Sequence, residues 1–360
     1  GSMLAARLLR HACSDRLHIT LVERDEAFGP GLAFGRARAG HLLNVPAGNM
    51  SALDDDAGHF LRWAQERDAG VKTGDFLPRQ SYGTYLRETL DECEQGSRAV
   101  LERVRGQAVD VNVREDEPAR VRLADGRVLE CERVALCLGN FPPGRLGAMK
   151  PELESRGLVV LDPWSPGALE GLDPDGDVLL VGTGLTMVDV VTDLIARGQR
   201  GVIHALSRRG LMPASHRGPS RPPAHRDPPA ALATWDGRAR SLVRIMRQAV
   251  EDGASEKGGG VDWREVVTSI RGVTPELWQR MNNVERAKFL RHARAYWEVA
   301  RHRLAPSIAQ TVNEHVKAGK LVVGAGRVKE ISERDAGLEV VITPRGESGT
   351  RTLRVARVLN

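Results

Sequence analysis

Two glycines, Gly182 and Gly184, separate a short apolar run from an apolar stripe at helical spacing. The run 177–181 predicts a buried strand, and the helix is expected to begin at Leu185 and Thr186. A glycine turn between a strand and a helix directs unpaired backbone N–H groups and the positive end of the helix dipole at one point. Such a point stabilises a pyrophosphate, so these four residues predict a dinucleotide-binding turn.

A second apolar run, 201–206, follows the predicted helix and ends in Ser207, Arg208 and Arg209. An acid at this position usually binds the ribose 2′-OH of NAD, whereas a basic residue suits the 2′-phosphate of NADP. Met187 replaces the third glycine of G-x-G-x-x-G, so the motif depends on its context. The pattern predicts an NADP site; the alternative is a phosphate-free βαβ unit with a solvated arginine pair.

The start of the chain resembles the second part of another dinucleotide motif. Residues 3–10 predict a helix, and 17–22 a strand that ends in Glu23. Glu23 is either the ribose ligand of a Rossmann unit or an ordinary charge at a strand end. Gly1 is either part of a cloning remnant or the last glycine of a fingerprint cut off upstream. We favour the second, because the helix and the strand need a partner strand.

The same succession of elements is expected in two stretches of the chain. In each stretch a β-hairpin with alternating apolar and polar residues is followed by an apolar strand. The strands expected in the first stretch are 100–113, 119–123, 128–131 and the apolar 134–139, with Asp125-Gly126 as a turn. Those expected in the second are 327–331, 338–343 and the apolar 352–359. The repeat predicts two similar halves.

Composition limits the function further. A length of 360 residues favours two domains. The net charge of +5 comes mostly from arginines spread along the chain, so we expect no nucleic-acid partner. No apolar run reaches about 18 residues, so we expect no membrane span. The four cysteines form no CxxC pair, which argues for the cytoplasm and against a zinc site or a redox dithiol.

Several segments together resemble a family of bacterial FAD/NAD(P)-binding proteins. That family is distantly similar to N-hydroxylating and flavin-containing monooxygenases and to thioredoxin reductases. The segments that carry the resemblance are 19–24, 29–34, 41–50, 76–85, the Gly182 region and the helix 289–306. The resemblance covers nearly the whole chain and implies FAD in the first half and a nicotinamide cofactor in the second.

By position, the resemblance also implies FAD-binding residues. These are Gly1 at the pyrophosphate, Glu23 at the adenosine ribose with Arg24 next in sequence, Asn44, Pro46 and Met50 near the isoalloxazine, Arg79 at the flavin or its phosphates, Val109 at the adenine, and Gly139 where the chain passes the cofactor. Asn44 has the donors and acceptor that suit a flavin's polar edge, but it could also be a turn residue. Arg79 offers a fork for two pyrophosphate oxygens or is a solvated loop arginine.

The segment 232–306 is expected to be a helical insertion. Three of its tryptophans, Trp263, Trp278 and Trp297, are expected to be packing anchors. Two histidines and three arginines line a substrate cleft or a charged helix face: His292, His302, Arg291, Arg301 and Arg303. In the preceding loop, His216 and His225 lack the acids and spacing of a metal site, so we expect no metal.

The sequence therefore predicts an α/β protein with two Rossmann-like dinucleotide-binding domains, each with a three-layer, mostly parallel sheet and β-hairpin insertions. Residues 1–150 would bind FAD without their first strand, and 151–360 would bind NAD(P). We expect truncation at both ends, and therefore weak flavin binding by these 360 residues. The expected function is a FAD-dependent, NADPH-using oxidoreductase, monooxygenase-like; a non-catalytic nucleotide-binding sensor or interaction module is the alternative. The residues indicate no catalytic side chain, substrate or oligomeric state.

Overall fold

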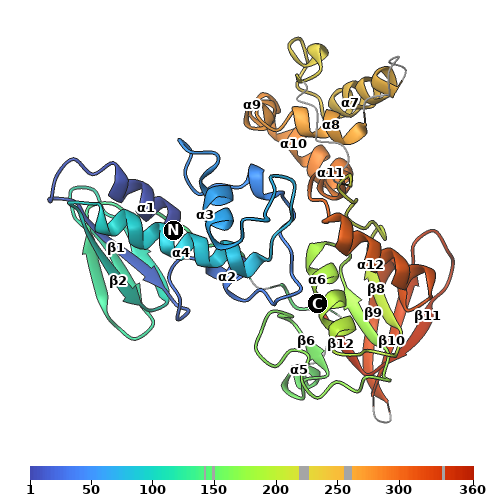
Figure 1. Ribbon diagram of the computed structural model, residues 1–360. Helices are drawn as coiled ribbons and strands as arrows, with labels where there is room; N and C mark the ends of the chain where they lie inside the picture. The colour runs from blue at the N-terminus through green and yellow to red at the C-terminus, as the bar shows by residue number, and fades with distance from the viewer. Residues whose placement is uncertain (142, 148–150, 219–226, 255–261, 335–336) are drawn as a thin grey trace. The chain divides into compact units, whose positions relative to one another are not determined.

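The computed structural model describes residues 1–141, 143–147, 151–218, 227–254, 262–334 and 337–360. The chain divides into two compact units, Gly1–Pro143 (unit 1) and Gly144–Asn360 (unit 2). Both are mixtures of helices and sheets with parallel strands (Figure 1). The predicted α/β class is confirmed. Within the described residues, no helix combines the length and the apolar character needed to cross a membrane.

Unit 1 has three layers. Helices α1 (Ser2–Arg10) and α4 (Arg79–Gln95) pack on one face of a parallel strand pair. The pair consists of β1 (His18–Glu23) and β2 (Val100–Arg105). Three antiparallel strands cover the other face: β3 (Ala108–Asn112), β4 (Ala119–Leu123) and β5 (Val128–Cys131). The other elements are α2 (Gly31–Gly35), the 3-10 helix η1 (Ala47–Asn49) and α3 (His59–Arg67).

Aromatic side chains form a second core in unit 1, between α3 and α4. Phe60 and Tyr85 are fully buried, and their ring centroids lie 5.0 Å apart. Tyr82 packs edge-on against Phe60 at 4.9 Å. Burial raises the pKa of Tyr82 to about 12, because the phenolate would lose its hydration.

Two strand predictions in unit 1 need correction. The expected strand 100–113 is two strands, because the chain turns at Gly106 from the parallel pair to the antiparallel layer. The expected strand 134–139 does not form. Among the described strands none pairs with it, and its Leu136 and Leu138 are 64% and 65% exposed. An apolar run without a neighbouring ladder has no place for its backbone hydrogen bonds.

Unit 2 is organised around one seven-stranded sheet with the order β11-β10-β9-β8-β7-β12-β6. Its strands are β6 (Val159–Val160), β7 (Val178–Val181), β8 (Ile203–Ser207), β9 (Leu321–Arg334), β10 (Gly337–Pro344), β11 (Arg351–Val355) and β12 (Arg357–Leu359). The five strands from β9 to β6 are parallel, and β10 and β11 add an antiparallel meander. The sheet is therefore mostly parallel, as predicted.

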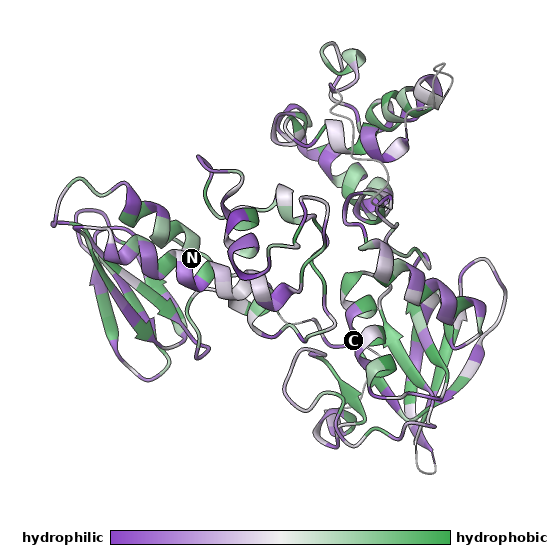
Figure 2. Cartoon of the chain, viewed as in Figure 1, coloured by the Kyte–Doolittle hydropathy of each residue, from purple (hydrophilic) through white to green (hydrophobic). Residues whose placement is uncertain are grey.

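Alternating side chains of the central strands fill two cores. Val178 and Leu180 of β7 face a core with α6 (Leu185–Ala196) and α12 (Pro306–Lys317). Leu179 faces the other side, together with residues of β10, β11 and the short helix α5 (Pro151–Ser155). All three residues are at most 2% exposed. Figure 2 shows the resulting concentration of hydrophobic residues along the central strands.

Helix α6 is terminated by a glycine, Gly198, just after its C-cap. Gly198 has φ +79° and follows the C-cap Arg197. Its amide donates to Ile195 O, and the Gln199 amide donates to Leu194 O, both at 3.0 Å. This pair of bonds is a Schellman motif, which a glycine allows because it adopts positive φ without strain.

The rest of unit 2 is the helical insertion. It comprises η2 (Ala230–Leu232), α7 (Ala239–Ala254), α8 (Trp263–Ser269), α9 (Thr274–Arg280), α10 (Asn283–Lys288), the π-helix η3 (Phe289–Ala293) and α11 (Arg294–Arg301). These helices share their own core, which includes Trp235, Leu242 and Leu277. The insertion is joined to the sheet through two segments that pair with each other: the His216 amide donates to Leu304 O at 2.9 Å, and the Leu304 amide to Ala214 O at 2.8 Å.

Candidate nucleotide-binding sites

The predicted pyrophosphate turn joins β7 to α6. Gly182 has φ +121°, a conformation that residues with a Cβ rarely adopt. Gly184 caps α6 with φ −86° and ψ −164°, and no side chain bonds to the cap. A Cβ at either glycine would meet no atom within 4 Å. The first-turn amides, among them those of Leu185 and Thr186, thus lie beside an open turn at the positive end of a 12-residue helix.

Thr183, between the two glycines, connects this turn to the end of β8. Its hydroxyl lies 2.8 Å from Ser207 Oγ and also bonds to the Leu211 carbonyl oxygen. Because a carbonyl oxygen only accepts, the single Thr183 proton goes to Leu211, and the Ser207 hydroxyl donates to Thr183. The Gly210 amide in turn donates to Ser207 Oγ at 3.0 Å. Ser207 therefore uses its only proton to hold the two loops together.

The two predicted phosphate ligands after β8 have different surroundings. Arg208 is exposed. Arg209 is half-buried; its Nη2 donates to the Arg291 carbonyl oxygen at 2.8 Å, and its guanidinium carbon lies 5.2 Å from the centroid of the Tyr296 ring. Neither arginine forms an ion pair with an acid in the part of the chain that the structure describes. Two uncompensated positive charges thus follow the strand next to the glycine turn.

In unit 1, the start of α1 lies beside the segment that ends at Gly139. A Cβ at Gly1 would lie 3.3 Å from Leu21 Cδ1 and 3.5 Å from Cys137 Cβ, so the helix start, β1 and this segment meet. Glu23, at the end of β1, accepts the amides of Arg24 and Asp25 with one carboxylate oxygen, at 2.8 and 3.2 Å. The Glu23 carboxylate is thereby fixed at the end of the strand.

Gly139 and Val109, two further residues predicted at FAD, are accessible. Gly139 has φ +65°, and a Cβ there would meet nothing within 4 Å. Val109 lies in β3 and is 48% exposed. Both positions are open to a ligand.

The loop that contains Asn44 is paired with the segment before α4. Leu43 donates its amide to Leu77 O at 2.8 Å, and Arg79 Nε donates to Leu42 O at 3.0 Å. Pro46 precedes η1, and Met50 ends it and packs against the aromatic core. The structure therefore brings Arg79 next to the Asn44–Met50 loop, and one arginine donor already holds that loop.

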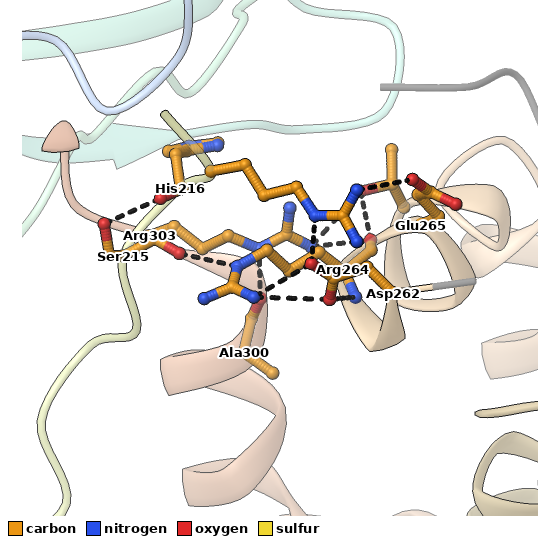
Figure 3. A network of polar contacts seen from close by, with 9 residues as sticks. Ser215, His216, Asp262, Arg264, Glu265, Ala300 and Arg303 are labelled. Carbon is orange, nitrogen blue, oxygen red and sulfur yellow. Dashed lines mark hydrogen bonds and ion pairs between the residues drawn. The ribbon is translucent and has the colours of Figure 1, made fainter. Parts of the chain in front are cut away.

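A buried ionic network joins the insertion to its connecting segments (Figure 3). Asp262 pairs with Arg217 and Arg264, and Glu265 pairs with Arg217 at 3.3 Å. Burial would raise the pKa of Asp262, but hydrogen bonds from the Arg264 amide and the Arg217 guanidinium outweigh it and hold this pKa below its usual value. The network anchors α8 to the segment that enters the insertion.

Arg303 completes this network and is only 6% exposed. It donates to the carbonyl oxygens of Ala300 and Arg264, at 2.8 and 2.9 Å. Burial, with the nearby charges of Arg264 and Arg301, lowers the pKa of Arg303 to about 10. Its donors therefore serve the insertion's backbone rather than an open cleft.

Of the other predicted polar residues of the insertion, Arg291, His292 and His302 are exposed and Arg301 is half-buried. Partial burial and the charge of Arg301 lower the pKa of His302. Trp297 packs in the insertion core, and Trp278 is 36% exposed. The guanidinium carbons of Arg264 and Arg303 lie 4.6 and 5.3 Å from the centroid of the Trp263 ring. His225 lies outside the described residues. Within those, no three His, Cys, Asp or Glu residues gather as metal ligands would.

Comparison with known proteins gives these sites a context. Residues 1–141 match the FAD-NAD(P)-binding family. The resemblance predicted from the motifs is thereby confirmed for unit 1, as is its class of cofactor. None of the curated proteins is detectably similar in sequence.

Several solved structures share the fold over almost the whole chain. An ornithine N-hydroxylase from Kutzneria sp. 744, with reduced FAD, NADP⁺ and L-ornithine, is 12% identical, with a TM-score of 0.56, over 99% of this chain and 77% of that one. A FAD-bound cadaverine monooxygenase from Erwinia amylovora is 12% identical (TM-score 0.60; 100% and 75% covered). An ornithine hydroxylase from Pseudomonas aeruginosa is 10% identical (0.57; 100% and 79%). The predicted likeness to N-hydroxylating monooxygenases is confirmed for the fold.

Sequence reasoning missed two side chains of the unit 2 site, Thr183 and Tyr296. Thr183 stands between the two glycines, and a short hydroxyl residue in that turn was a usable signal. Tyr296 carries no such signal, because it reaches Arg209 only through the packing of the insertion.

Proposed function

We propose that the chain is a FAD-dependent, NADPH-using oxidoreductase of monooxygenase type. The observation that carries the proposal is the pairing, at adjacent strands β7 and β8, of an open glycine turn with two arginines that no described acid neutralises. The turn suits a pyrophosphate, and the arginines suit a 2′-phosphate. The FAD-NAD(P)-binding match of residues 1–141 and the monooxygenase fold support the flavin half of the proposal.

The proposal gives roles to the predicted residues of the glycine turn and of the segment after β8. In unit 2, the amides of Leu185 and Thr186 bind the pyrophosphate beside Gly182 and Gly184. Arg208 and Arg209 bind the 2′-phosphate through charge-assisted hydrogen bonds. Ser207 positions their loop, because its proton is bonded to Thr183.

In unit 1, the start of α1 at Gly1 faces the FAD pyrophosphate, and the fixed Glu23 carboxylate accepts the ribose hydroxyls. Arg79, which donates to Leu42, is assigned to the flavin or its phosphates. Asn44 lies on the loop that Arg79 holds. When bound, the two cofactors supply the redox chemistry, in which NADPH reduces FAD and the electrons pass to oxygen or another acceptor. The chain binds and orients them.

Flavin reduction tests the function directly. The protein is saturated with FAD, freed of oxygen and titrated with NADPH or NADH while the flavin absorbance is recorded. We expect bleaching by NADPH, and faster bleaching than by NADH. Binding of both cofactors without reduction would contradict the oxidoreductase and favour the nucleotide-binding sensor.

Removal of the arginine pair tests the nicotinamide half separately. We expect Arg208→Ala with Arg209→Ala to weaken NADPH binding by about 1.5–3 kcal/mol for each charge-assisted bond lost. NADH binding should change little, because NADH has no 2′-phosphate. Calorimetric titration measures both affinities. Equal affinity of the unmutated protein for NADPH and NADH would refute the assignment of the pair.

A further inference from the structure

Arg209 is the point where the helical insertion contacts the proposed nucleotide site. The contact has two parts. Arg209 Nη2 donates to the Arg291 carbonyl oxygen at 2.8 Å, and the guanidinium carbon lies 5.2 Å from the centroid of the Tyr296 ring. Both partners belong to the insertion, far from Arg209 in sequence. The insertion therefore fixes one edge and one face of this guanidinium group.

The Arg291 carbonyl belongs to a π-helix. The turn Phe289–Ala293 separates α10 from α11, and the Arg294 amide bonds to Phe289 O, five residues back. π-Helical turns are rare, and they occur frequently at functional sites. Here the wider turn presents the carbonyl that Arg209 uses. The irregularity of the helix thus coincides with the contact.

We propose that Tyr296 and the π-helical turn are positioning elements for Arg209, and that the insertion thereby sets the preference for NADPH over NADH. The inference rests on the proposed function of the arginine pair. A guanidinium has five N–H donors in one plane. One donor bonds to Arg291 and the ring covers one face, so the other donors keep a fixed direction for phosphate oxygens.

The charge of Arg209 also stays available. Glu298, the acid that follows Tyr296 on α11, pairs with Arg294 at 2.7 Å rather than with Arg209. Arg208 lacks the support that Arg209 has, since it is exposed and no ring or carbonyl of the described residues holds it. A supported arginine loses less side-chain entropy when it binds phosphate. Arg209 should therefore depend on the insertion, whereas Arg208 should not.

Calorimetric titration of matched variants with NADPH and NADH tests this inference. Tyr296 is 53% exposed, so truncation should leave the fold intact, which thermal melting checks. Tyr296→Ala should raise the Kd for NADPH by about 2- to 5-fold, the range of an exposed cation–π contact, and leave NADH unchanged. Tyr296→Phe should keep the unmutated affinities. Val284→Ala trims another exposed side chain of the insertion, on α10 and 62% exposed, and should alter neither affinity.

A double variant shows whether Tyr296 acts through Arg209. Tyr296→Ala added to Arg209→Ala should weaken NADPH binding no further than Arg209→Ala alone. Equal losses of NADPH and NADH affinity in Tyr296→Ala would show a merely structural role and overturn the inference. No loss in Tyr296→Ala, with a clear loss in Arg209→Ala, would overturn the inference but leave the proposed function standing. If Arg209→Ala itself has no effect on NADPH, both fail.

Discussion

Two apolar runs that follow β-hairpins behave differently in the two units. In unit 2, the run ends in β12, which pairs with β6 on one side and β7 on the other. Its Leu359 is 2% exposed. In unit 1, the run 134–139 forms no strand, and Leu138 is 65% exposed. The run in unit 2 even contains Arg354 and Arg357, whereas 134–139 has no charged residue, so apolar content does not decide which run forms a strand.

The difference shows that an apolar run becomes a strand only where neighbouring ladders accept it. A buried strand needs partners for every backbone N–H and C=O group, and those partners come from distant parts of the chain. The residue types of a run indicate only how readily it is buried. They do not report whether a gap between two strands exists to receive the run.

The largest expected effect compares the leucines of these runs. Leu359→Ala should lower the free energy of unfolding of unit 2 by about 2–5 kcal/mol, because it leaves a cavity beside α6 and β7. Leu138→Ala should change the stability of unit 1 by less than about 0.5 kcal/mol, since its side chain is exposed. Urea unfolding of both variants measures the two changes in the free energy of unfolding. A similar, large loss in both would mean that run 134–139 is buried in solution.

A smaller effect is expected at the glycines Gly182 and Gly139. Both have positive φ and open space where a Cβ would lie. At Gly139, φ +65° lies in the left-handed helical region, so Gly139→Ala should cost only about 1 kcal/mol. At Gly182, φ +121° lies outside that region, and Gly182→Ala should cost more, about 1–3 kcal/mol. Thermal melting of both variants compares the two losses of stability. A larger loss in Gly139→Ala than in Gly182→Ala would contradict the expectation from the φ angles.

Gly184→Val separates stability from binding in the same turn. Its φ of −86° suits any residue and its surroundings are open. Valine there should therefore leave the melting temperature nearly unchanged, while its side chain blocks the pyrophosphate and abolishes NADPH binding. Normal NADPH affinity in a folded Gly184→Val protein would remove the turn from the nucleotide site.

The smallest effect concerns the aromatic core of unit 1, which has no counterpart in the aliphatic cores of the unit 2 sheet. The pKa of Tyr82 is raised to about 12, so unfolded chains lose this proton near pH 10 and folded ones only near pH 12. Stability should fall as the pH rises through this window. In the Tyr82→Phe variant, the decrease in the free energy of unfolding between pH 8 and pH 11 should be about 1 kcal/mol smaller than in the unmutated protein. Parallel unfolding curves at pH 8 and 11 measure it; identical pH dependence in both proteins would show an accessible hydroxyl.

Local signals in the sequence predicted the elements they encode. The turn at Asp125-Gly126 forms, with Gly126 at φ +90° and the Arg127 amide bonded to Asp125. The strand, glycine turn and helix at 178–196 form as well. In each case the decisive interactions join residues a few positions apart, so the residue types alone determine them.

The parts that escaped prediction depend on distant partners. The contact of Tyr296 with Arg209 and the bond between Thr183 and Ser207 require the packed unit. The strand β9 was expected over 327–331 but extends from Leu321 to Arg334, because β8 and β10 both offer it a ladder. The pattern of apolar residues along the chain does not indicate which distant strands pair with each other.

The length of β9 has a consequence for how unit 2 unfolds. Its first five residues pair with β8 in the parallel core, and the residues from Gly326 onward pair with β10 in the meander. One continuous backbone thus belongs to both ladders, and neither can open without disturbing the other. We expect the amides of β10 and those of β7 to exchange with solvent deuterium at the same free energy, as a single cooperative unit.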